Sequence, residues 1–178
     1  CVGSLGSVVF DEGSLPKPGN LYLIDLDGSV QVVATDVRLT NGLAFSPDAS
    51  TLYHADSRRQ SVFCYPVSSD GTLGDRKVFI TTETGVPDGL AVSEDGAVWI
   101  ALAGGSGVGV YGSDGAHRET LTIPVPMCTS VCFGGDDLRD LYIVSGSDGS
   151  DGEREGGIYR YRSDVAGLPV PAARVTIH

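Results

Sequence analysis

Short apolar runs, separated by turns rich in Gly, Asp, Ser and Pro, extend along the chain. No stretch follows the period of about 3.6 residues that marks an amphipathic helix. Short apolar runs bounded by turn residues are typical of β-strands joined in hairpins. The pattern therefore predicts an all-β protein.

One segment occurs three times. It stands first at residues 40–48 (TNGLAFSPD), then at 87–95 (PDGLAVSED) and, in weaker form, at 128–136 (CTSVCFGGD). Each copy opens with a small polar or acidic residue, continues through a short apolar run and ends in a turn. Each copy therefore predicts a strand that begins with a chemically useful side chain.

Three further strands are predicted after each copy. They are an apolar strand with an aromatic near its start (52–53, 98–99, 141–142), a third strand (62–65, 108–111, 158–161) and a more polar fourth strand (76–81, 118–123, 173–177). A repeat of about 40 to 50 residues with four antiparallel strands is typical of a propeller blade, because one sheet buries both faces only when neighbours stack on it.

We expect one propeller domain with a partial blade at residues 1–37 and complete blades at 38–84, 85–126 and 127–178. The first range matches only the second to fourth strands of a blade, so we expect the chain to be the downstream part of a longer protein. An open arc of blades leaves apolar sheet faces uncovered, and we expect the chain alone to be inactive and poorly soluble.

Two longer loops are predicted. The loop at 4–18 carries Asp11, Glu12 and Lys17, and it would either cover one end of the central channel or lie solvated on the surface. The loop at 145–157 (SGSDGSDGEREGG) is acidic, but its spacing fits no EF-hand, which favours a solvated hairpin loop over a cation site.

Charge and cysteine content narrow the function classes. With 12 Lys and Arg against 23 Asp and Glu, the net charge is −11, so we expect no nucleic acid partner. No apolar run approaches the roughly 18 residues of a membrane span, and we expect no membrane partner. The cysteines fall at predicted strand positions, which favours buried reduced thiols in a cytoplasmic protein. They are Cys1, Cys64, Cys128 and Cys132.

Asn41, Asp88 and Thr129 hold the same position in the repeat, at intervals of 47 and 41 residues. Because the innermost strands of a propeller begin at the same end of its channel, these residues should form a ring. An amide oxygen, a carboxylate and a hydroxyl are hard ligands suited to Ca²⁺, Mg²⁺ or Mn²⁺, and Zn²⁺ is acceptable. The other interpretation, that Asn and Asp cap turns with their own side chains, remains open.

Four motifs resemble, in order and separation, those of the regucalcin (senescence marker protein) and gluconolactonase family. They are NGLAFSPD at 41–48, YHADS at 53–57, PDGL at 87–90 and TSVCFGG at 129–135, and the agreement extends over residues 3–171. The resemblance implies a six-bladed propeller with one divalent metal ion in its channel. It also implies hydrolysis of sugar lactones or related esters.

By position, the resemblance makes Asn41 an amide ligand of the metal. It makes Asp88 a second ligand that also serves as the catalytic acid/base. The family's third ligand, a Glu, and its substrate-binding Arg and Asn correspond to sequence upstream of residue 1. Asp56 matches a recurring Asp of the family, but on a second strand we expect it to brace the sheet through hydrogen bonds.

Two other functions remain open. One is a non-catalytic propeller that serves as a binding scaffold or calcium-binding module, and the other is a metal-free propeller enzyme of the strictosidine synthase type. The sequence has no Gly-x-Ser-x-Gly elbow, P-loop or His-Glu-x-x-His helix. Its histidines, His54, His117 and His178, have no partners at ligand spacing.

Overall fold

The computed structural model describes residues 1–4, 17–147 and 156–170 of the chain. Within these ranges the strands form four antiparallel sheets, and one 3-10 helix, η1 (Ser57–Arg59), follows the fifth strand. No helix of the described ranges is long and apolar enough to cross a membrane. The all-β prediction is therefore confirmed.

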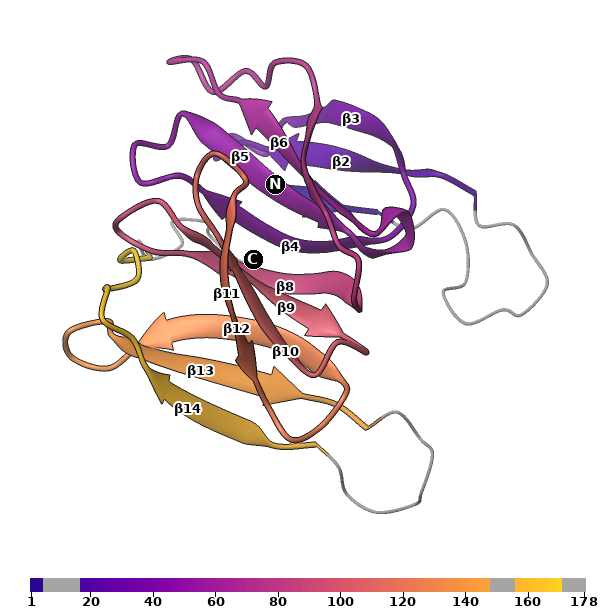
Figure 1. The fold of residues 1–178 in the computed structure, drawn as a ribbon. Helices are drawn as coiled ribbons and strands as arrows, with labels where there is room; N and C mark the ends of the chain where they lie inside the picture. The colour runs from indigo at the N-terminus through magenta and orange to yellow at the C-terminus, as the bar shows by residue number, and fades with distance from the viewer. Residues whose placement is uncertain (5–16, 148–155, 171–178) are drawn as a thin grey trace.

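The sheets follow one another in chain order, and each is built from consecutive strands (Figure 1). The first comprises β1 (Val2–Gly3), β2 (Gly19–Ile24) and β3 (Val30–Val37), and the second β4 (Thr40–Phe45), β5 (Thr51–Asp56), β6 (Ser61–Pro66) and β7 (Lys77–Thr81). The third comprises β8 (Val86–Val92), β9 (Val98–Ala103), β10 (Gly107–Tyr111) and β11 (His117–Thr122), and the fourth β12 (Cys128–Gly134), β13 (Asp140–Ser145) and β14 (Ile158–Arg162). Consecutive antiparallel strands of this kind are the topology of propeller blades.

The turn after the innermost strand is built in the same way in the second and third sheets. In the turn from β4 to β5, Asp48 accepts hydrogen bonds from the hydroxyls of Ser46 and Ser50, which lowers the pKa of Asp48 to about 2. In the turn from β8 to β9, Asp95 accepts from the Ser93 hydroxyl over 2.6 Å. The Ser-x-Asp spacing of the first two copies of the segment therefore closes the first hairpin of the second and third sheets.

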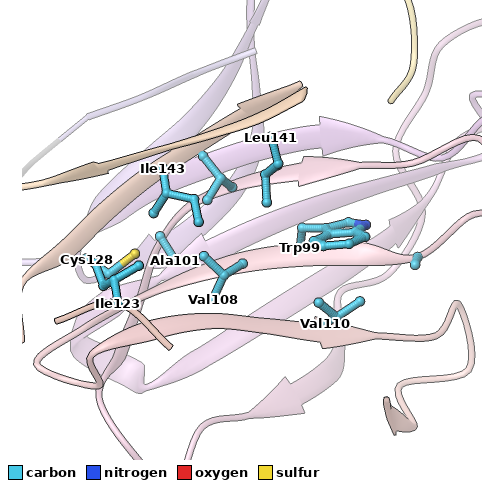
Figure 2. Close-up of a cluster of buried hydrophobic side chains, with 10 residues drawn as sticks. Trp99, Ala101, Val108, Val110, Ile123, Cys128, Leu141 and Ile143 are labelled. Atoms are coloured by element: carbon cyan, nitrogen blue, oxygen red, sulfur yellow. The ribbon is translucent and has the colours of Figure 1, made fainter. Parts of the chain in front are cut away.

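The core lies between successive sheets. Figure 2 shows one cluster, in which Trp99, Val108 and Val110 of the third sheet pack with Leu141 and Ile143 of the fourth. Each of these side chains is at most 4% exposed. Comparable clusters join the first sheet to the second and the second to the third. These side chains are buried because the next sheet covers them, and burial stabilises the fold by about 25 cal/mol per Å² of apolar area. Each blade therefore depends on its neighbour for stability.

The strand predictions agree with the structure apart from small shifts and segments outside the described residues. Strand β11 starts one residue earlier than predicted, at His117. The last sheet has three strands within the described residues. The fourth strand predicted at 173–177 lies outside them, together with His178 and most of the loops at 4–18 and 145–157.

The prediction for the cysteines is wrong in part. All four are free, but Cys1 and Cys132 are exposed, while Cys128 is buried. Cys1 precedes β1 and does not lie on a strand. Cys132 follows the buried Val131 on β12, and because successive residues of a strand face opposite sides, it points away from the core.

Candidate functional site

Asn41, Asp88 and Thr129 occupy equivalent positions on the inner strands, each at an irregularity of the strand pairing. The register shifts between Thr40 and Leu43 in β4, between Pro87 and Leu90 in β8, and between Cys128 and Ser130 in β12. Bulges redirect side chains and are frequent beside active sites. The residues were predicted to be first in their strands, which is wrong by one or two positions because the bulge interrupts the pairing without ending the strand.

The inner strands β4 and β8 lie side by side, as do β8 and β12 (Figure 1). Glycines permit this approach. A Cβ added to Gly42 would lie 2.7 Å from the Asp88 carbonyl oxygen, and one added to Gly89 would lie 2.8 Å from Ser130 Cα. The Asn-Gly and Asp-Gly pairs of the repeat thus combine a polar side chain with the residue that lets the next backbone come close.

The Asn41 side chain is held by Ser57. Its Nδ2 donates to Ser57 Oγ over 2.8 Å, and the Ser57 hydroxyl donates to the Pro87 carbonyl oxygen over 2.6 Å. Pro87 directly precedes Asp88, so these two hydrogen bonds join the two candidate ligand positions across the gap between sheets. Asn41 is therefore connected to the next blade through its side chain and Ser57.

Asp88 is half-buried on β8. Desolvation raises the pKa of its carboxyl to about 6, and a hydrogen bond from the Gly89 backbone opposes this shift. The ion pairs found in the described part of the chain do not include Asp88. A partly desolvated carboxylate without a cationic side chain beside it is a suitable position for a metal ion.

Thr129 differs from the other two ring residues. Its Oγ1 donates to the Val144 carbonyl oxygen over 3.1 Å, so the hydroxyl is engaged within its own sheet. No group of three or more His, Cys, Asp and Glu that could hold a metal ion occurs among the described residues. This result agrees with the two metal ligands predicted from this chain, because only Asp88 is one of these four residue types and the other ligand is the amide of Asn41.

Asp56 braces the sheet, as predicted. It is fully buried, and its carboxylate accepts the backbone N–H groups of Arg38 at 2.8 Å and Leu39 at 2.9 Å. The Arg59 guanidinium lies 3.6 Å away. These contacts fix the chain between β3 and β4, directly before Asn41.

Ser57 is the residue that the sequence prediction missed. It lies within the YHADS motif at 53–57, but no role was assigned to it. Its place in the sequence, directly after the second strand of a blade, could have indicated a role, because a side chain at this place reaches the next sheet. Its partner, the Pro87 carbonyl, cannot be identified from sequence because the contact forms only when two blades stack.

Blade-like sheets with polar side chains on adjacent inner strands define a β-propeller protein with a candidate cation site. A family model described as the SMP-30/gluconolactonase/LRE-like region matches residues 4–147. The chain belongs to this family, and the resemblance found in its motifs is confirmed.

Two of the relatives have names that state a sugar lactonase activity. A 6-deoxy-6-sulfogluconolactonase from Pseudomonas putida is 35% identical over 176 residues, which cover 91% of this chain and 60% of that protein. A pentonolactonase from Haloferax volcanii is 32% identical, with coverage of 88% and 60%. A solved structure of a calcium-binding protein, regucalcin from Agrobacterium tumefaciens, has a TM-score of 0.80 at 26% identity and covers 88% of this chain and 56% of that one. The chain thus spans little more than half the length of these relatives.

Proposed function

We propose that the full-length protein is a metal-dependent hydrolase of sugar lactones. The observation that carries the proposal is the pair Asn41 and Asp88, which lie at equivalent bulges of neighbouring inner strands and are linked through Ser57 and Pro87. The names of two relatives support the substrate class. Six blades, as the family resemblance implies, form part of this proposal.

The carboxylate of Asp88 and the amide oxygen of Asn41 would hold one divalent ion, Ca²⁺, Zn²⁺, Mn²⁺ or Mg²⁺. Both are oxygen donors of the kind these ions take, and Asp88 is a partly desolvated carboxylate that benefits from a positive charge. When bound, such an ion supplies Lewis-acid polarisation of the lactone carbonyl. Asn41 is uncharged and would orient the site without neutralising it.

Asp88 would act as the acid/base residue. As a carboxylate it accepts a proton from the attacking water while the water oxygen bonds to the carbonyl carbon of the lactone. The same proton then passes to the ring oxygen as the carbon–oxygen bond of the ring breaks. One water is consumed, and the product is the open-chain hydroxy acid.

The Asp88→Asn variant of the full-length protein tests this role. The variant loses the carboxylate that would bind the metal ion and accept the proton, so lactone turnover should fall by at least about 100-fold. Turnover is measured as acid release from gluconolactone with each ion supplied in turn. Asp48→Asn, the same change in an exposed turn of the neighbouring sheet, should retain activity. Turnover by Asp88→Asn equal to that of the wild type would rule out the role.

A calcium-binding module without catalysis is the second candidate, and the match to a regucalcin described as calcium-binding favours it. Under both functions, calcium should raise the melting temperature of the wild type but not of Asp88→Asn. Lactone turnover separates them, and its absence with each of the four ions would favour the module.

A further inference from the structure

We propose that Ser57 is a positioning residue that fixes the Asn41 amide so that its oxygen, and not its nitrogen, faces the metal position. The inference rests on the proposed metal site and extends it to a residue that does not contact the ion. It follows from the order of the hydrogen bonds, from the burial of Ser57 and from the different chemistry of amides and carboxylates as ligands.

The single hydroxyl proton of Ser57 determines the orientation of the amide. The Pro87 carbonyl, 2.6 Å from Ser57 Oγ, can only accept, so the Ser57 proton lies in that hydrogen bond. The contact of 2.8 Å to Asn41 therefore requires Asn41 to donate, and only Nδ2 can do so. A flipped amide would place two oxygen atoms together without a proton between them. Oδ1 is thus turned away from Ser57 and is the atom of the amide that can serve as a ligand.

Burial makes this orientation firm. Ser57 is 5% exposed, and its hydrogen bond to Pro87 is buried, so water does not compete for either partner. The backbone of Ser57 is also fixed, since its N–H donates to the Leu39 carbonyl and its carbonyl accepts from Gln60 N–H. The hydroxyl is therefore a preorganised acceptor for the Asn41 amide.

Among the second, third and fourth sheets, this hydroxyl occurs only in the second, whose inner strand carries Asn41. Strand pairing places Ala103 of the third sheet and Gly146 of the fourth at the positions equivalent to Ser57. Neither has a side chain that forms hydrogen bonds. The inner-strand ligand of the third sheet is Asp88, and the two oxygens of a carboxylate are equivalent, so no orienting partner is required there. An amide has one ligating end, and the blade that offers an amide has the serine.

The same chain of bonds couples Asn41 to Asp88. Pro87 precedes Asp88 in β8, and the Ser57 hydroxyl holds its carbonyl directly at the register shift. Outer partners of this kind orient ligands, and their loss commonly costs 10-fold to 100-fold in metal affinity. Ser57 thus sets both the direction of one ligand and the position of the strand that carries the other.

The test measures metal affinity in the full-length protein, with Mn²⁺ followed by electron paramagnetic resonance and Ca²⁺ by calorimetry. Ser57→Ala should weaken binding about 10-fold to 100-fold, and Ser57→Thr, which keeps the hydroxyl, should remain within about 3-fold of the wild type. The melting temperature of the metal-free protein is recorded for each variant. Affinity of Ser57→Ala equal to that of the wild type would overturn the inference.

A second background separates orientation from a merely structural role. Asn41→Asp replaces the amide by a carboxylate, whose ends are equivalent and which has no proton to donate to Ser57, so Ser57→Ala should then lower metal affinity by no more than about 3-fold. An equal loss in both backgrounds would show that Ser57 only supports the fold and would overturn the proposal. Because the readout is binding, a wild type that holds metal but hydrolyses no lactone refutes the proposed catalysis and leaves this test intact.

Discussion

His54 lies fully buried on β5, next to the residues that support the site. Its Nε2 is 3.3 Å from Thr40 Oγ1, and Nδ1 has no hydrogen-bond partner among the described residues. Burial lowers the pKa of His54 from 6.5 to about 4, against the opposing charge of Asp56. The imidazole is therefore neutral in the folded protein at pH 5, where most unfolded chains would carry it protonated.

This difference predicts a pH dependence of stability. The imidazole of His54 binds a proton more readily in the unfolded chain than in the folded protein. The free energy of unfolding is therefore unaffected by protonation of His54 above pH 6.5 and decreases as the pH falls from 6.5 towards 4, by about 3 kcal/mol at most. Urea unfolding of the full-length protein and of His54→Phe at several pH values measures it. Carboxylates titrate in both proteins, so the difference between the two curves isolates His54. Parallel curves between pH 4 and 6.5 would contradict the prediction.

At the scale of single residues, the sequence predicted those that recur and missed those that act across blades. Asn41 and Asp88 were selected as candidates because the repeat aligns them, and their ligand roles stay predictions. Asp56 was assigned a bracing role that the structure confirms. Ser57 was missed because its function depends on a carbonyl 30 residues away. Repetition marks equivalent positions, but contacts between stacked sheets leave no periodic trace.

Among the elements, the bulged inner strand is the one that carries the candidate site residues. The sequence predicts its apolar run and its closing turn. It does not predict the register shift, because the shift depends on which residues of β5, β9 or β13 pair with the strand. The Gly that follows Asn41 or Asp88 is the visible sign of the bulge, and it has a second role at the contact between sheets.

Gly42→Ala should disturb that contact. The new Cβ would lie 2.5 Å from Leu90 N and 2.7 Å from the Asp88 carbonyl oxygen, both backbone atoms that move only with β8. We expect a loss of about 1 to 3 kcal/mol in the free energy of unfolding, together with weaker metal binding because Asp88 shifts. Chemical denaturation and Mn²⁺ titration of the full-length protein measure the two effects.

Gly74→Ala is the matched control for this prediction. The three atoms nearest to a Cβ on Gly74 belong to the Pro66 side chain, at 3.4 to 3.5 Å, which is ordinary contact. The control should keep metal affinity and change stability by less than about 1 kcal/mol. A Gly42→Ala variant with the properties of this control would show that the inner strands are not tightly apposed.

In the molecule as a whole, the first sheet has one covered face and one exposed face. Leu21 is fully buried against the second sheet. Pairing places Val2 and Val32 opposite Tyr22, and Ile24 opposite Val30, so these residues share the other face. Val2, Ile24, Val30 and Val32 are each 50 to 60% exposed. The chain spans 60% of the Pseudomonas relative, whose further length is enough for additional sheets.

Val32→Lys should therefore have opposite effects in two forms of the protein. In residues 1–178 expressed alone, a charge on the exposed apolar face should raise the soluble fraction, because such faces promote association. In the full-length protein, where a further sheet would cover this face, the buried charge should lower the free energy of unfolding by about 3 kcal/mol. Val78→Lys, a change at a similarly exposed position on β7, should behave alike in both forms. If Val32→Lys leaves the stability of the full-length protein unchanged, this face is open to solvent and the sheet stack ends there.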